Sequence, residues 1–385
     1  MRKLAKLSLV AAVAVAGLST SAVADSLAEA FAASKVKGEI KSQYFQKEKE
    51  NGANAKSSIW SNGGNLSLTT GSFNGLTAGV TFQTAHVTSI DDDNNNYSGD
   101  MDVSGSVMSE AYLAYTLGNT TAKIGRQYIT TPLVAGSGSR ILKQSFEGIV
   151  LVNTDVPNTT LVAAYVDKFQ ARTDGNGDTP EFEQVADGAY TVYAKNTSVQ
   201  DLTLQAQYAL VKELNAGEDV KALYIDAAYK LNNVTVSAQT YQTDNGAATN
   251  SDGSLYGIKV AGNIGAISAV AAYTTTDDEA DVVAGLGSGA DGSFTASPID
   301  GGHYDADTDS YQVGLGYKFN MGLGLNASYT NWDTNGGDSL SETNVTASYP
   351  FTKNLSTKVM YSAYDNDTSL TRYDYRSRVY LSYKF

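Results

Sequence analysis

Apolar and polar residues alternate with a period of two along most of the chain. In the segment that ends the chain, Val379, Leu381 and Tyr383 fall on one parity, whereas Arg378 and Lys384 fall on the other. Successive side chains of a β-strand point to opposite faces of the sheet. The segment therefore predicts a strand with one apolar face and one polar face.

The same alternation recurs in about eighteen segments of about ten residues each. They lie at residues 35–47, 58–70, 76–88, 107–117, 119–127, 147–154, 158–168, 188–197, 202–211, 220–231, 233–243, 254–263, 266–276, 308–319, 322–332, 341–350, 355–365 and 373–385. Only the first residues and a short Leu27–Ala33 piece have a helical pattern.

The connections between these segments fall into two length classes that alternate along the chain. Short connections include 71–75, 118–119, 232–233, 264–265 and 320–322, whereas the long ones lie at 89–106, 128–146, 169–187 and 277–307. Short turns on one side and long loops on the other are typical of an antiparallel meander in the outer membrane.

A soluble β-sandwich is the competing architecture, because it also alternates, with its apolar face turned inward. Tyrosines at both ends of the apolar face favour the membrane, since amphipathic rings fit the two bilayer interfaces. Tyr115, Tyr229, Tyr317, Tyr349 and Tyr383 fall at the short-turn ends, and Tyr44, Tyr165, Tyr208, Tyr273, Tyr329 and Tyr361 near the long loops. The pattern predicts an all-β fold: a closed antiparallel transmembrane β-barrel of about 18 strands, with short periplasmic turns and long extracellular loops. An open sheet would leave two rows of unpaired backbone groups in hydrocarbon, at several kcal/mol each.

The N-terminus has the features of a secretory signal. Arg2, Lys3 and Lys6 precede an apolar run from Leu7 to Leu18, and small residues follow up to Ala24. A charged start, a short apolar core and a small-residue site are what signal peptidase recognises. We expect residues 1–24 to be a signal peptide and residues 25–385 to form one barrel in the outer membrane of a Gram-negative bacterium. The final Phe385 resembles the signal that the barrel-assembly machinery recognises.

Composition excludes several classes of function. The 385 residues include no Cys and two His, and the formal net charge is −14. The absence of Cys excludes a disulfide framework, thiolate zinc sites and cysteine nucleophiles. The acidic balance argues against nucleic-acid binding. His86 and His303 have no nucleophile motif beside them, so we expect no enzyme and no cofactor.

The charges on the predicted inward face are mainly basic, although the chain is acidic. The inward parity collects Lys37, Lys41, Lys123, Lys195, Lys259, Lys318, Lys358, Arg376 and Arg378, against Glu39, Glu110 and Asp226. A barrel of 16–18 strands leaves an aqueous channel, so a cationic wall would hold carboxylates or phosphates weakly and pass them along. The alternative is that these cations pair with loop carboxylates and only fix the loops.

The long outer loops 89–106, 169–187 and 277–307 are acidic. Residues 277–309 hold nine Asp or Glu and no Lys or Arg. Most simply, these loops form a solvated surface. The more specific alternative is that the loops bind calcium, because Asp174–Asp178 resembles the start of a calcium-binding loop. Thr179 and Val185, however, depart from the EF-hand pattern.

The segment 122–153 resembles the third-loop region of outer-membrane porins of the OprD family. The shared elements are Gly125-Arg126-Gln127, Thr131-Pro132-Leu133, Ser139-Arg140 and Phe146-Glu147-Gly148. The resemblance implies eighteen strands, a third loop (127–146) that folds inward as the constriction, and a basic ladder for carboxylate-bearing solutes such as amino acids. It also places Arg126 and Arg140 at or near the constriction. By periodicity alone, Arg126 has the outward parity of Ile124, so a bulge or strand end is required to turn it inward.

These features predict a porin, a water-filled channel for passive diffusion of small hydrophilic solutes and ions. The residues predicted to line the pore or its constriction are Arg126, Arg140, Lys123, Lys195, Lys259, Lys358, Arg376 and Arg378. The alternative is a surface adhesin or receptor barrel whose long loops bind partners. Expected partners are outer-membrane lipid and lipopolysaccharide, small solutes, and further copies in a homotrimer. The least lipid-like outward rows, near 58–70 and 119–127, would mark the contact between copies.

Overall fold

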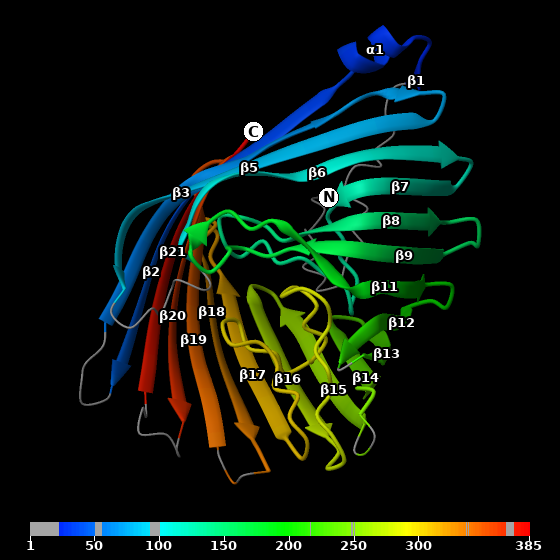
Figure 1. Ribbon diagram of the computed structural model, residues 1–385. Coiled ribbons are helices and arrows are strands. Elements are labelled where there is room, and N and C mark those ends of the chain that lie inside the picture. The colour runs from blue at the N-terminus through cyan, green and yellow to red at the C-terminus, as the bar shows by residue number, and fades with distance from the viewer. Residues whose placement is uncertain are drawn as a thin grey trace.

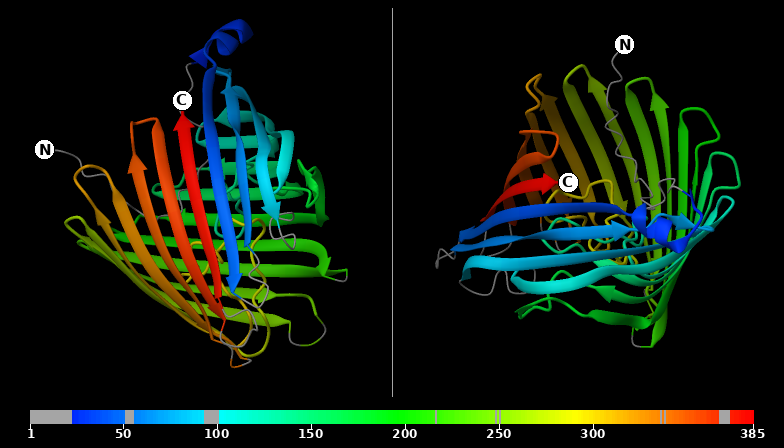
Figure 2. Two further views of the ribbon diagram at one scale, coloured as in Figure 1. Left: turned by 90° about the vertical axis from the view of Figure 1, so that its left-hand side faces the viewer. Right: turned by 90° about the horizontal axis from the view of Figure 1, so that it is seen from above.

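The computed structural model describes residues 23–50, 56–92, 101–215, 217–247, 249, 251–335, 337, 339–366 and 373–385. The chain forms one ring of antiparallel strands around a central bore (Figures 1 and 2). Of its 21 strands, three have two residues each and lie beside the ring, and the other eighteen form it. No helix in the described part of the chain is long and apolar enough to cross a bilayer.

The elements follow one another in a simple meander. They are β1 (Val23–Ala24), α1 (Leu27–Ala32), β2 (Lys35–Glu50), β3 (Lys56–Thr69), β4 (Ser72–Phe73), β5 (Leu76–Asp92), β6 (Val103–Leu117), β7 (Thr120–Gln127), β8 (Ser145–Asn153), β9 (Thr159–Gln170), β10 (Gly177–Asp178), β11 (Phe182–Asn196), β12 (Leu202–Asn215), β13 (Glu218–Leu231), β14 (Val234–Asp244), β15 (Asp252–Ile264), β16 (Ile267–Thr276), β17 (Asp309–Lys318), β18 (Gly324–Asp333), β19 (Ser339–Pro350), β20 (Leu355–Asn366) and β21 (Tyr373–Lys384). Each of the eighteen segments predicted from the alternation corresponds to one strand of the ring.

The first and last strands of the ring close it. β2 pairs antiparallel with β21 from Glu39↔Lys384 to Glu50↔Tyr373. The ladder continues beyond β21, because Gly38 N–H donates to the Phe385 carbonyl at 3.0 Å and Phe385 N–H donates back at 3.1 Å. Closure removes the free edges that an open sheet would expose to hydrocarbon.

The two faces of the wall have the polarity of a membrane barrel. Outward residues such as Leu315 and Ile258 are 65% and 61% exposed, whereas the inward Gln207 is 1% exposed. Two belts of outward tyrosines confirm the predicted girdles. Exposed members are Tyr44, Tyr208, Tyr273 and Tyr361 near the long loops, and Tyr115, Tyr229, Tyr317 and Tyr383 near the short turns. The apolar surface therefore faces lipid, and the polar surface faces the bore.

Two outer loops are shorter than the alternation predicts. β5 extends to Asp92 and β6 begins at Val103, inside the expected loop 89–106. β9 extends to Gln170 and β11 begins at Phe182, inside the expected loop 169–187. Beyond the bilayer a strand no longer needs an apolar face, so these ends lack the pattern by which they could be recognised. Most of the predicted signal, residues 1–22, lies outside the described residues, and Val23–Ala24 forms β1 beside β4.

The seam at Gly38 gives a test of closure. A Cβ atom on Gly38 would lie 2.3 Å from Cζ of Phe385, whose ring covers this glycine. We expect Gly38→Val to displace the ring and lower the yield of folded barrel, measured as the fraction that keeps its compact mobility on an unheated gel. Ile40→Val, a change on the same outward face, should fold normally. Equal folding of both variants would show that the seam does not depend on this contact.

Candidate functional site: a bore narrowed by two loops

The constriction loop, residues 128–144 between β7 and β8, runs through the bore from wall to wall. On one side, Leu133 N–H donates to Oε1 of Gln207 on β12 at 2.8 Å. On the other, the backbone of Lys143 makes two hydrogen bonds with the Gln83 amide on β5, at 2.8 and 2.9 Å. Nζ of Lys41 on β2 donates to the Gly138 carbonyl at 3.3 Å. The loop is thus fixed at both ends by amide and lysine side chains of the inward face.

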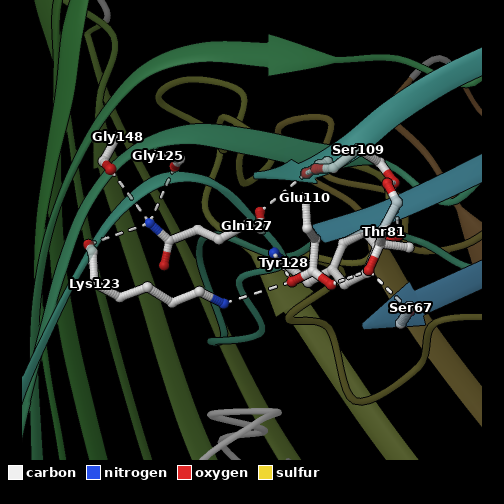
Figure 3. Close-up of polar contacts among 10 residues, drawn as sticks. Ser67, Thr81, Ser109, Glu110, Lys123, Gly125, Gln127, Tyr128 and Gly148 are labelled. Carbon is white, nitrogen blue, oxygen red and sulfur yellow. Dashed lines mark hydrogen bonds and ion pairs between the residues drawn. The ribbon is translucent and has the colours of Figure 1, made fainter. Parts of the chain in front are cut away.

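Glu110 on β6 holds the start of the constriction loop (Figure 3). Its carboxylate accepts from Thr81 Oγ1 at 2.7 Å, from Tyr128 N–H at 3.4 Å and from Lys123 Nζ at 3.5 Å. Tyr128 is fixed at its other end, because its hydroxyl lies 2.9 Å from Ser109 Oγ. A charged acceptor with three donors is stronger than three neutral pairs, so Glu110 sets where the chain leaves β7.

The side-chain amide of Gln127 also stabilises the end of β7, where the constriction loop begins. Its Nε2 lies 3.2 to 3.4 Å from the carbonyls of Lys123, Gly125 and Gly148 (Figure 3). Gly125 has φ +115°, which L side chains rarely adopt, so glycine is required where β7 bends toward the loop.

The acidic loop, residues 277–308 between β16 and β17, also folds into the bore, where Figure 2 shows it in yellow. The amide of Gln239 on β14 accepts from Phe294 N–H at 2.7 Å and donates to the Gly292 carbonyl at 2.8 Å. Farther along, Ser297 Oγ donates to Glu342 on β19 at 2.7 Å, and Asp300 pairs with Arg376 on β21. The loop thus spans from β14 to β21 across the bore.

The two loops are joined to each other. Ala135 N–H donates to the Leu286 carbonyl at 3.0 Å, and Leu286 N–H donates to the Leu133 carbonyl at 2.9 Å. Gln144 adds a side-chain link, donating to Ser288 Oγ at 3.0 Å. The constriction is therefore one unit built from both loops.

Among the described residues, two chambers of the bore lie on either side of residues 136–144. The outer chamber, toward the long loops, has a volume of about 880 Å³, and the inner chamber, toward the short turns, about 840 Å³. Ser139 lines both of them. A solute that passes through the bore must therefore pass the tip of the constriction loop.

The lining of both chambers is mainly basic. Among the described residues, the outer chamber is lined by Lys47, Arg140, Arg172, Arg376 and Arg378 against Asp291 and Asp300, and the inner by Lys41, Lys143, Lys358 and Lys384 against Glu39. Nine basic side chains thus face three acidic ones, in a chain whose formal net charge is −14.

Aromatic rings support several of these cations. Nζ of Lys143 lies 3.9 Å from the centre of the Tyr128 ring, and Nζ of Lys358 lies 4.5 Å from that of Tyr380. The Arg378 guanidinium lies 5.0 Å from the Phe45 ring. A ring face attracts a cation through its quadrupole but carries no net charge. The rings therefore orient these side chains without neutralising them.

Arg376 is held differently. Its guanidinium pairs with Asp300 of the acidic loop, and with Asp374 at 3.0 Å. Arg376 and Lys123 thus pair with carboxylates and hold loops in place. This is the role that the alternative interpretation of the sequence gives to the inward cations.

The predicted pore residues occupy three kinds of position. Arg140, Lys358, Arg376 and Arg378 line the chambers. Lys123 supports the constriction loop through Glu110, and Nζ of Lys259 on β15 lies 3.9 Å from the Phe294 ring, under the acidic loop. Lys195 lies on the inward face of β11, within electrostatic range of Asp226. The structure adds Lys143 and Arg172, which the alternation could not place because they belong to loops. It also adds Lys47 and Lys384, which share the inward parity of Lys41 and Arg378 but are not among the predicted lining residues.

The expected position of Arg126 is wrong. It was expected at or near the constriction, but it lies in the outward row of β7, the row of Ile124. Its Nε lies 2.9 Å from Glu147 on β8, and its guanidinium packs 4.2 Å from the Phe182 ring. The periodicity thus gave the correct side, and no bulge turns this residue inward.

The described parts of the acidic loops contain no cluster of metal-binding side chains. Within the described ranges, no group of three or more His, Asp or Glu side chains could hold a metal ion. The Asp174–Asp178 turn closes on itself, since Asp174 Oδ1 accepts from the N–H groups of Asn176 and Asp178 at 2.7 and 2.9 Å. These bonds lower the pKa of the Asp174 carboxyl.

His303 is a packing residue of the acidic loop. Its ring centre lies 4.4 Å from that of Trp332, which is fully buried, and the two rings are tilted by 38°. Burial lowers the pKa of this imidazole, which favours the neutral ring that can pack there.

An eighteen-stranded barrel with a polar bore narrowed by inward loops is a porin, a channel of the Gram-negative outer membrane for small solutes. The chain belongs to the Campylobacter major outer membrane protein family, whose profile matches residues 2–279, more than two thirds of the chain. No curated protein sequence matches it.

Solved structures of OprD-type porins share the fold. Acinetobacter baumannii OccAB1 superposes with a TM-score of 0.78 at 16% identity, covering 91% of this chain and 96% of that one. Pseudomonas aeruginosa OpdO gives 0.75 at 17%, covering 91% and 97%, and P. aeruginosa OpdK, solved with vanillate, gives 0.75 at 15%, covering 91% and 98%. The resemblance read from residues 122–153 is confirmed, and these relatives are channels rather than enzymes.

The Glu110 contacts generate a prediction. Glu110→Gln removes the charge that holds Lys123 and Tyr128, which we expect to cost about 2 kcal/mol, the usual worth of hydrogen bonds to a charged group. The constriction loop should then fluctuate, raising the open-channel noise of single-channel recordings and lowering the urea midpoint of unfolding.

Glu147→Gln is the matched control, because Glu147 faces outward and pairs with Arg126. Its current noise should equal that of the wild type. If the current noise of Glu110→Gln also equalled that of the wild type, Glu110 would not position the constriction loop.

Proposed function

We propose that this porin conducts small solutes by passive diffusion and favours those that bear carboxylates, such as amino acids. The single observation that supports the preference is the excess of basic side chains along the chambers, nine against three acidic ones. No reaction is involved, and solutes cross down their gradients through water in the bore.

The charged groups act at different points along the path. In the outer chamber Arg140 and Arg378 flank the Phe45 ring, at 5.4 and 5.0 Å from its centre. A carboxylate arriving from outside meets these two guanidiniums before the tip of the constriction loop. Beyond Ser139 it meets Lys143 and Lys358 of the inner chamber. A series of weak sites lets an anion enter and leave again.

Arg376 is expected to act mainly on the acidic loop. Its two carboxylate partners offset its charge, so its direct effect on ions in the bore is smaller than that of Arg378. Changing Arg376 would release Asp300 and disturb the loop, which makes Arg378 the cleaner residue for a selectivity test.

We predict that the wild-type channel is anion-selective in a potassium chloride gradient and that Arg378→Glu moves the reversal potential toward cations. At ~8 Å, a change of two charge units alters the energy of a passing ion by about 1 kcal/mol in water. This corresponds to roughly a fivefold change in the local concentration of each ion, upward for cations and downward for anions. Planar-bilayer recording measures this shift.

The control is Lys221→Glu, which makes the same charge change outside the bore at an exposed pair with Asp244. It should leave the reversal potential unchanged. A cation-selective wild type, or equal effects of the two substitutions, would refute the proposed preference.

We also infer that further copies of the chain, most simply two in a homotrimer, cover one polar sector of the outer wall. On β3, β5 and β6, outward positions are occupied by Asn62, Thr84, His86 and Ser106, the last three exposed. Asn62 donates to Thr88 at 2.6 Å, and Ser106 to Thr84 at 3.0 Å. Polar side chains lose hydration when they face lipid, whereas contacts between transmembrane segments favour small and polar residues.

Thr84→Trp should block this contact and shift the detergent-purified protein from oligomer to monomer, as measured by native mass spectrometry. Val313→Trp, on the outward face of β17, should leave the oligomer intact, because that face is expected to meet lipid. A monomeric wild type, or a Thr84→Trp oligomer as stable as that of the control, would exclude the sector as a subunit contact.

A further inference from the structure

We propose that the inner chamber is a binding site for doubly charged oxyanions, such as sulfate, doubly ionised phosphate or a small dicarboxylate. The proposal rests on the anion preference proposed above and goes beyond it, because it requires several cations to act on one ligand. Four lysines line this chamber of about 840 Å³, and Glu39 is the one acidic residue among the described residues of its lining.

The strand register brings two of the lysines to one wall. Lys358 on β20 is aligned with Tyr380 on β21, which is aligned with Gln43 on β2. Lys41 precedes Gln43 by two residues, so it lies on the same inward face, two strands from Lys358. The two ammonium groups are within electrostatic range of each other.

The constriction loop brings a third lysine to the same chamber. The backbone of Lys143 is fixed to Gln83, and its ammonium group lies over the Tyr128 ring at 3.9 Å. Lys143 is also within electrostatic range of Lys41. Lys41 is thus repelled by both Lys143 and Lys358, and the three ammonium groups lie around one water-filled space.

In the described part of the chain, Lys143 and Lys358 form no ion pair, although the more distant carboxylate of Glu110 also attracts Lys143. For Lys143 and Lys358, the close contacts that the structure describes are with the Tyr128 and Tyr380 rings. Lys41, by contrast, lies 3.6 Å from Glu39. A ligand can therefore approach Lys143 and Lys358 without displacing an ion-pair partner.

A doubly charged oxyanion relieves this repulsion better than a singly charged one. Each ammonium–anion attraction scales with the product of the charges, so it doubles for a divalent ligand, and each lysine can add a charge-assisted hydrogen bond. The outer chamber is a poorer site, because Asp291 and Asp300 lie among its cations. We therefore place the site below the constriction.

The test uses the full-length channel in planar bilayers, with potassium chloride as the current carrier. Potassium sulfate is added to the short-turn side, and potassium acetate serves as the singly charged comparison. We expect sulfate to reduce the chloride current in a saturable way and acetate to do so only weakly. Phosphate should block more strongly at pH about 8 than at pH about 6, because it gains its second charge in this range, while block by sulfate should not change.

The double variant Lys143→Gln/Lys358→Gln should raise the half-blocking sulfate concentration about tenfold, the equivalent of about 1.4 kcal/mol. Lys143→Arg/Lys358→Arg should retain the block, which separates charge from side-chain shape. Lys212→Gln/Lys221→Gln removes two lysines that pair with Asp219 and Asp244 at the loop-side rim, and it should behave as the wild type.

Two failures can be told apart. An anion-selective wild type in which sulfate and acetate act alike, or in which the glutamine variant keeps its block, would overturn the divalent site and leave the proposed function standing. A wild type that prefers cations would overturn both.

Discussion

The requirement that every backbone amide be paired inside the bilayer governs the rest of this structure. Hydrocarbon offers no partner to a free N–H or C=O, so the strands must pair side by side until the last meets the first. β2 and β21 meet that requirement along twelve aligned residue pairs, and Gly38 and Phe385 extend it to the last residue. Once the ring is closed, each strand has a lipid face and a bore face, and alternation along the sequence follows.

A ring of eighteen strands is too wide for its wall side chains to fill. The bore is instead narrowed by two loops, whose apolar residues need burial of their own. Leu133 of the constriction loop and Val282 of the acidic loop obtain it against Tyr224, Tyr241 and Leu255 of the wall. The constriction is thus a small apolar core built inside a polar bore, and inward tyrosines provide both an apolar ring for packing and a hydroxyl for the loop backbone.

The sequence predicts the strands because their determinants are local, and it fails where contacts are distant. The face of the barrel wall on which Arg126 lies could be predicted from the residues two positions away. The path of the constriction loop depends on pairs such as Leu133 with Gln207, 74 residues apart, and Gln144 with Ser288, 144 apart. Lys123 and Lys358 look alike in the alternation, yet one supports a loop and the other lines a chamber. Only the positions of Glu110 and Tyr380 distinguish them.

The net charge of the chain is a poor guide to the charge of its bore. Acidic residues outnumber basic ones in the sequence, but among the described residues only three of them line the two chambers. Within the bore the type of support decides what a passing ion meets. A carboxylate beside a cation, as at Arg376, cancels the charge and fixes the chain, whereas a ring beside a cation, as at Lys358, fixes the side chain and leaves the charge in place. The distribution of rings and carboxylates around equivalent lysines and arginines therefore separates those that build the channel from those that select among its solutes.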